Sequence, residues 1–181
     1  MLPYFKRSEN NSRGADAFHG TGGPLDVSDV VMNPVSLRLA DAAREALGVA
    51  ANPDFNGAAQ EGAGRYQATI RNGVRCSTAL AFLRPALARR NLLVKTIAHV
   101  NRVELAGGRA VGVSYSHDGA VHSARAAREV ILAAGAIGSP QLLLLSGIGP
   151  ADELRAQGVQ VAVELPGVGK NLQDHRSEEH T

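Results

Sequence analysis

The stretch from Glu129 to Pro150, EVILAAGAIGSPQLLLLSGIGP, constrains the fold of this chain more than any other. Residues 130–133 are small or branched apolar residues without a polar interruption, which is typical of a strand buried on both faces of a parallel sheet. Ala134, Gly135 and Ala136 follow, and they are small enough for another backbone or a ligand to approach closely. We therefore expect a buried strand that ends in a turn of small residues.

A short helix is expected after this turn. Ser139 and Pro140 predict its start, because a serine at the N-cap accepts from a free amide and proline suits the first helical position. Residues 141–145, a glutamine followed by four leucines, are expected to form a short and mainly apolar helix, and Ser146 with Gly147 ends it at a residue tolerant of left-handed φ. A strand, a turn and a helix in this order can present backbone N–H groups to a phosphate. On the pattern alone, a packing unit without a ligand remains an equal alternative.

The residues of this stretch resemble the second signature of the glucose–methanol–choline (GMC) flavoprotein oxidoreductases. The resemblance is complete over the fifteen positions from Gly135 to Gly149. Further segments follow in the family's order: LPYFKRSE at 2–9, HG at 19–20, GGPL at 22–25, Arg75 with Ser77 and Thr78, LPGVG at 165–169, and NLQDH at 171–175. The resemblance thus covers essentially residues 1–175.

This resemblance implies an α/β fold: part of a Rossmann-type FAD-binding domain with an antiparallel β-meander, interleaved with part of an α+β substrate-binding domain. Residues 1–90 would belong mainly to the substrate side and residues 91–175 to the FAD-binding domain. The residues themselves also predict the meander, because three close-set strand patterns are separated by glycine-bearing turns. These patterns lie at residues 98–105, 110–116 and 121–124.

The resemblance also implies bound FAD and names the residues near it. The family touches adenine through the backbone at the position of Val100, and it places the strand end at Ala133, Ala134 and Gly135 near the dinucleotide. Gly135 has a case of its own, since only glycine lets a backbone or ligand approach without meeting a Cβ. Val100 has none, because a backbone contact leaves no side-chain signature.

The closing loop supplies the remaining candidates, Asn171, Asp174 and His175, which the family places against the cofactor and the border of the active site. His175 suggests a base, because the unperturbed pKa of histidine lies near neutrality, yet the family's proton-abstracting histidine belongs to a later, C-terminal segment. We therefore predict no catalytic residue in this chain. Ser146 is no nucleophile candidate, because Leu-Ser-Gly-Ile-Gly differs from the G-x-S-x-G elbow.

By resemblance, the intact protein would be a choline dehydrogenase-like enzyme that oxidises a primary alcohol, with hydride passing to the flavin. The phosphate-cradling G-x-G-x-x-G of such enzymes does not occur here, so the chain is expected to be an internal fragment without activity of its own. Two alternatives stay open. One is a non-redox lyase of the same family, and the other is a flavin-free interaction module that uses residues 142–145 and the meander edge.

Composition excludes several other classes. The formal charge is +2 with scattered Lys and Arg, so a nucleic-acid partner is not expected. The isolated histidines, His19, His99, His117 and His122, have no metal-ligand spacing, so we predict no metal. Cys76 is the single cysteine and suits a reducing compartment. No apolar run approaches the ~20 residues of a membrane span.

We expect a small alcohol as substrate, an unassigned electron acceptor, and a place in the cytoplasm or peripheral to the inner membrane.

Several further elements follow from periodicity and turn residues. The loop HGTGGP, at 19–24, lacks the G-x-G-x-x-G spacing and is expected to lead into a strand at 25–28 rather than to bind phosphate. Helices are expected at 35–47, after the cap Asn33-Pro34, at 77–88 with Ser77 or Thr78 as cap, and at 151–157. Strands are expected at 66–70, 92–96 and 159–165.

The last six residues, RSEEHT at 176–181, are polar and charged, unlike the structured continuation found in the family. They resemble the translation of a sequencing-library adapter, so we expect a non-native tail added to a truncated reading frame. Resequencing the locus should find different codons after His175, and finding RSEEHT encoded there would refute this.

Overall fold

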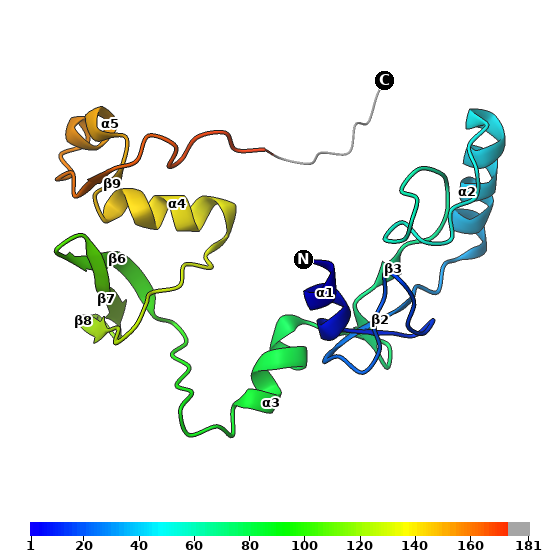
Figure 1. Cartoon of the computed structure of the whole chain (residues 1–181), viewed down its shortest axis with the longest axis horizontal. Helices are drawn as coiled ribbons and strands as arrows, with labels where there is room; N and C mark the ends of the chain where they lie inside the picture. The colour runs from blue at the N-terminus through cyan, green and yellow to red at the C-terminus, as the bar shows by residue number, and fades with distance from the viewer. Residues whose placement is uncertain (174–181) are drawn as a thin grey trace. The chain divides into compact units, whose positions relative to one another are not determined.

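The computed structural model describes residues 1–173, and it divides into two compact units, Met1–Leu93 and Val94–Thr181 (Figure 1). Asp174, His175 and the tail at 176–181 lie outside the described residues. Among the described residues, no helix combines the length and the apolar character needed to cross a bilayer.

The first unit combines short helices with short strands. In chain order its elements are α1 (Leu2–Ser8), β1 (Glu9–Asn11), β2 (Leu25–Asp29), α2 (Pro34–Leu47), β3 (Gln67–Ala68), β4 (Ile70–Arg71), β5 (Val74–Arg75), the π-helical turn η1 (Ala79–Leu83) and α3 (Arg84–Ala86). Strand β2 is central in the order β1-β2-β3 and pairs parallel with β1 and antiparallel with β3. Strands β4 and β5 form a hairpin.

The glycines of the HGTGGP loop serve packing. A Cβ on Gly20 would overlap the carbonyl group of Lys6, and one on Gly23 would overlap the backbone of Ser8. The loop therefore lies directly against the junction of α1 and β1 and leads into β2, as the sequence predicted.

Helix α2 begins and ends at the predicted residues. Asn33 is the N-cap, and its Oδ1 accepts from the amide of Ser36 at 2.9 Å. Pro34 follows as the first helical residue, and Gly48 ends the helix with a left-handed φ of 64°. The predicted helix is confirmed because its signals are local.

The second unit is built on the predicted meander. Its elements are β6 (His99–Ala106), β7 (Arg109–His117), β8 (Ala120–Arg125), α4 (Gly135–Leu145), β9 (Ile148–Gly149), α5 (Ala151–Ala156) and β10 (Val163–Glu164). The order β6-β7-β8 is antiparallel throughout. Each hairpin has two turn residues with positive φ, Gly107 with Gly108 and Asp118 with Gly119. Such turns match the twist of the paired strands.

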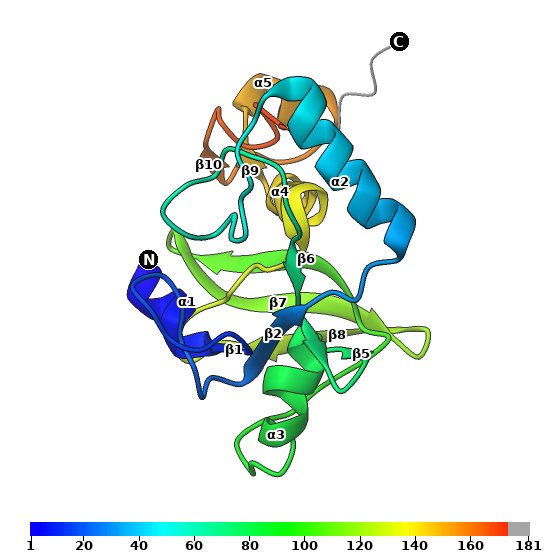
Figure 2. The same cartoon turned by 90° about the vertical axis from the view of Figure 1, so that its right-hand side faces the viewer.

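Helix α4 lies beside β6, the edge strand of the meander (Figures 1 and 2). The chain then forms β9 and α5 and returns in β10, which pairs parallel with β9. Gly147 is required at this crossing. Its φ is 77°, and a Cβ there would overlap the carbonyl oxygen of Gln160.

The predicted strand at 130–133 is wrong: these residues are outside the strands of the structure, and Ile131 is 79% exposed. A strand exists only where a neighbour accepts its backbone hydrogen bonds. No other strand pairs with 130–133 within the described part of the chain. The apolar pattern predicted burial on both faces, but Ile131 and Ala133 are exposed, because burial requires a partner.

The predicted helix start at Ser139 is also wrong. Helix α4 begins at Gly135 with Ala134 as N-cap, and Pro140 lies inside the helix. Ser139 still caps in a different way, since its Oγ accepts from the amide of Ala134 at 3.0 Å. The small-residue turn is therefore part of the helix N-terminus.

Other strand predictions fail in the same way. Residues 92–96 form no strand, 159–165 contributes only β10, and 66–70 is divided between β3 and β4.

Helix α1 was not predicted. The helix expected at 77–88 is instead the short pair η1 and α3, with the Oγ of Ser77 accepting from Leu80 at 3.3 Å.

We expect the 181-residue chain, expressed alone, to associate and to unfold without a sharp transition. Ile131 and Ile137 are 79% and 75% exposed, and contiguous apolar surface promotes association. Size-exclusion chromatography and circular dichroism melts measure this. Replacing both side chains with Asn should raise the monomer fraction. A monomeric unmodified chain with a cooperative melt would contradict the prediction.

Candidate functional site

A cavity of about 620 Å3 in the second unit brings together residues far apart in sequence. Strand β6 forms one wall, and the segment before α4 together with residues along that helix forms the other. The lining residues are Ala98, His99, Val100, Val113, Val130, Ile131, Leu132, Ala133, Ala134, Gly138, Gln141, Leu142 and Leu145. Three predicted cofactor residues, Val100, Ala133 and Ala134, thus line one cavity.

Val100 lies where the β6–β7 ladder is irregular. The register shifts between Val100 and Arg102, and the intervening Asn101 exchanges two side-chain hydrogen bonds with Ser116, of 3.0 and 3.2 Å. A bulge of this kind re-aims the neighbouring residues and interrupts regular pairing. Since β6 is also an edge strand, backbone groups near Val100 are available to a ligand.

The structure gives Gly135 a conformational reason to be glycine. Its φ is 82°, and no atom lies within 4 Å of the position that a Cβ would occupy. The backbone conformation therefore requires glycine, whatever fills the space beside it. Gly135 is next to the cavity lining, directly after Ala134.

The structure does not bring the closing-loop candidates, Asn171, Asp174 and His175, to this cavity within the described residues. Asn171 is exposed, has a positive φ of 56° and does not line the cavity. Asp174 and His175 lie outside the described residues.

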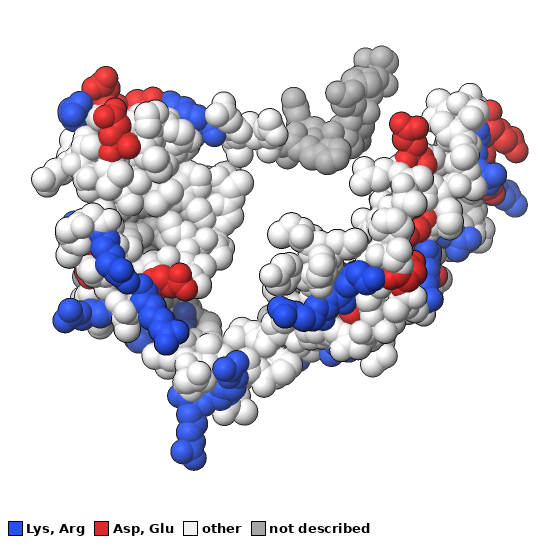
Figure 3. Space-filling model, in the orientation of Figure 1, with Lys and Arg blue, Asp and Glu red and all other residues white. Residues whose placement is uncertain are grey.

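The cavity suits a flat, largely apolar group. Its described lining includes no Lys, Arg, Asp or Glu. Figure 3 shows the same feature, a surface over α4 without Lys, Arg, Asp or Glu. Such walls favour a ring system held by van der Waals contact and a few backbone hydrogen bonds over a phosphate group.

A buried polar cluster in the first unit was missed by sequence reasoning. His19 is only 7% exposed, and it is not isolated as predicted. Its Nδ1 lies 3.1 Å from Glu9 Oε1, and its Nε2 lies 2.9 Å from Asp54 Oδ2. Asn11, also buried, approaches Nδ1 at 3.1 Å. The sequence held no signal for this cluster, because its members meet only through the fold.

The carboxylates of this cluster favour the protonated form of the buried His19. Burial alone would lower the pKa of His19, but the hydrogen bonds and charges of Asp54 and Glu9 outweigh it and raise the pKa above 6.5. The backbone amide of His19 also donates to Asp16 Oδ1 at 2.6 Å, and amide donors of this kind lower the pKa of Asp16. His19 thus joins three acidic side chains from separate segments.

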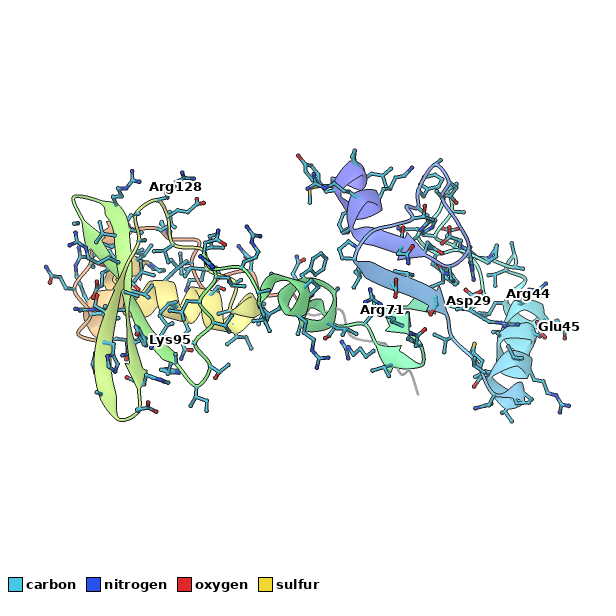
Figure 4. The ribbon with its side chains drawn as sticks, turned by 90° about the horizontal axis from the view of Figure 1, so that it is seen from below. Asp29, Arg44, Glu45, Arg71, Lys95 and Arg128 are labelled. Carbon is cyan, nitrogen blue, oxygen red and sulfur yellow. The ribbon has the colours of Figure 1, made fainter. Side chains whose placement is uncertain are left out.

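Ion pairs also stabilise the small sheet of this unit. Arg71, labelled in Figure 4, extends from β4 and pairs with Asp26 of β2. Hydrogen bonds from Asn10 and Arg71 lower the pKa of Asp26. Arg75, one of the residues that carry the family resemblance, is exposed on β5 shortly before the start of η1. Among the described residues, no cluster of three or more His, Cys, Asp or Glu could hold a metal ion.

Comparison with known proteins decides the family. The family model described as GMC oxidoreductase matches residues 1–177. The chain belongs to the GMC oxidoreductase family. It is similar to the mitochondrial choline dehydrogenase of Mus musculus, with 49% identity over 96% of this chain and 29% of that protein. The oxygen-dependent choline dehydrogenase of Brucella anthropi is 48% identical over 97% of this chain and 32% of its own length.

Solved structures agree with this membership. Pyridoxine 4-oxidase from Mesorbium loti superposes with a TM-score of 0.88 at 34% identity, over 96% of this chain and 34% of its own. An FAD-dependent oxidoreductase from Chaetomium thermophilum gives 0.86 at 30% identity, over 96% and 33%. The predicted family and the α/β fold class are confirmed. The chain spans about a third or less of these relatives.

The His19 cluster should make stability depend on pH with a defined sign. Because the folded-state pKa is raised, its contribution is complete below about pH 6.5 and is lost as the pH rises through the raised pKa. Thermal unfolding of the full-length protein from about pH 6.5 upward measures the loss. His19→Gln should remove this dependence, whereas His122→Gln, in the second unit, should leave it. An unchanged pH profile in His19→Gln would refute the prediction.

Proposed function

We propose that the full-length protein is an FAD-dependent oxidoreductase of the choline dehydrogenase kind, which oxidises the CH–OH group of a small primary alcohol. The observation that carries this proposal is the identity with choline dehydrogenases, 49% in the mouse protein, over 96% of this chain. A flavin-free interaction module is disfavoured by the same identity. FAD as cofactor agrees with the family and with the FAD-dependent neighbour among the solved structures.

The cavity fits a part of this cofactor. Its apolar walls, the irregular edge of β6 beside Val100 and the small Ala133 and Ala134 leave room for a flat ring near accessible backbone. When bound, FAD supplies the acceptor for the hydride of the alcohol. This chain contributes cofactor binding and the exclusion of water there. The group that takes the hydroxyl proton is expected outside it.

The site residues and domains follow from the same proposal. Val100, Ala133, Ala134 and Gly135 would contact or border FAD, with Asn171, Asp174 and His175 in the closing loop. Residues 1–90 would belong to the substrate-binding domain and residues 91–175 to the FAD-binding domain. The division into Met1–Leu93 and Val94–Thr181 supports this boundary. A cytoplasmic place, or one peripheral to the inner membrane, is proposed from the single cysteine, Cys76, which suits a reducing compartment.

Anaerobic addition of choline, or of other primary alcohols, to the purified full-length protein tests the activity. We expect the oxidised flavin absorbance to bleach and an aldehyde to form in equal amount, because hydride moves from the alcohol to the flavin. The lyase alternative predicts a different result. The flavin would stay oxidised with every alcohol, while the protein catalysed the breaking or forming of a carbon–carbon or carbon–nitrogen bond in its substrate.

Gly135→Val in the full-length protein tests the placement of this turn. Its left-handed φ should cost about 1–2 kcal/mol with any side chain, and the new methyl groups would fill the open space beside the cavity. We expect reduced FAD content per polypeptide, read from absorbance after denaturation.

Gly158→Val is the matched control. Gly158 also has positive φ, 71°, with open space around it, but it follows α5 and does not line the cavity. It should lose similar stability and keep its FAD. Equal FAD content in the two variants would contradict the placement.

A further inference from the structure

The hydroxyl of Ser146 joins the two walls of the cavity without lining it. Its Oγ accepts from the backbone amide of Val103 at 2.8 Å and donates to the carbonyl oxygen of Leu142 at 2.5 Å. Val103 belongs to β6, and Leu142 belongs to α4. One side chain therefore ties the edge strand of the meander to the C-terminal end of the helix.

Each of these elements carries one wall. Val100 lies on β6 three residues before Val103, and Leu142 and Leu145 of α4 line the cavity from the opposite side. The helix also continues directly from Ala133 and Ala134. The distance between the walls thus depends on how β6 and α4 are held, and Ser146 supplies a direct hydrogen bond between them.

The hydrogen bond is made where it matters energetically. Val103 is only 5% exposed, so its amide cannot readily exchange the serine for water. An amide left without an acceptor in such a place costs far more than an average hydrogen bond contributes. Strand β6 is an edge strand, and Ser146 occupies part of the side that β7 leaves open.

Backbone hydrogen bonds to the next residue fix the position of Ser146. The next residue, Gly147, has its carbonyl oxygen bonded by the amides of Ala162 at 2.8 Å and Val163 at 3.1 Å. The hydroxyl is therefore presented to β6 from a fixed backbone rather than from a free helix end.

We propose that Ser146 is a positioning residue for the cofactor. Its hydroxyl sets the separation of β6 and α4, and this separation sets the width of the cavity between Val100 and Ala133–Ala134, called the slot below. This rests on the proposed function, since it assigns the slot to a ring of FAD. Ser146 itself makes no contact with the cofactor.

The test uses the full-length protein, freed of FAD and titrated with it while flavin fluorescence is followed. Ser146→Ala removes both hydrogen bonds and should raise the Kd for FAD by roughly tenfold, because the two walls are no longer preorganised at the separation that binding requires. Ser146→Thr keeps the hydroxyl and should restore most of the affinity.

Ser123→Ala is the matched control. Ser123 also donates one side-chain hydrogen bond, to Glu104 at 2.8 Å, but it lies exposed on β8 and outside the cavity. Its Kd for FAD should equal that of the unmodified protein.

Hydrogen exchange of the Val103 amide in the FAD-free protein supplies a second readout, which needs no bound cofactor. Protection should fall in Ser146→Ala and stay high in Ser146→Thr. A Ser146→Ala protein that exchanges faster at Val103 yet binds FAD normally would overturn the positioning role, and so would equal weakening by Ala and Thr. Failure of the unmodified protein to bind FAD would instead refute the proposed function.

Discussion

The hydrogen-bonded ladder between β6 and β7 is the constraint on which the rest of the second unit depends. A two-residue turn at 106–109 sets where this ladder begins, and a second two-residue turn at 117–120 does the same for the ladder between β7 and β8. Once β6 is placed, its outer edge receives Ser146 and with it α4. The cavity beside Val100 lies between this strand and the helix that Ser146 ties to its edge.

The first unit depends on a different kind of interaction. Its strands have two to five residues, too few for a ladder alone to hold them. Side-chain networks supply the connection: His19 gathers Glu9 and Asp54, and Arg71 pairs with Asp26. These polar contacts join segments up to 45 residues apart. Charge therefore organises this unit, whereas backbone hydrogen bonding organises the other.

Sequence-based predictions succeeded where the signals for an element lie within that element, and failed where they do not. Helix α2 and the meander carry their signals within the elements: a cap at Asn33, a glycine at Gly48, and paired turns. Residues 130–133 are apolar and residues 92–96 begin with three apolar residues before Lys95 and Thr96. Such a run indicates strand-forming side chains but names no neighbouring strand. Their predicted strands failed because a strand also needs a neighbour with free backbone groups.

The sequence by itself determined the family, the presence of the meander and the residue types of the turn at Ala134 and Gly135, because these are local patterns or a motif with fixed spacing. Only the tertiary structure decided that Val100 and Ala133 line one cavity, that Ser146 joins its walls and that His19 is buried between two carboxylates. The physical reason is distance along the chain. Contacts between residues tens of positions apart arise from the path of the backbone, and neither periodicity nor composition encodes that path in any short window.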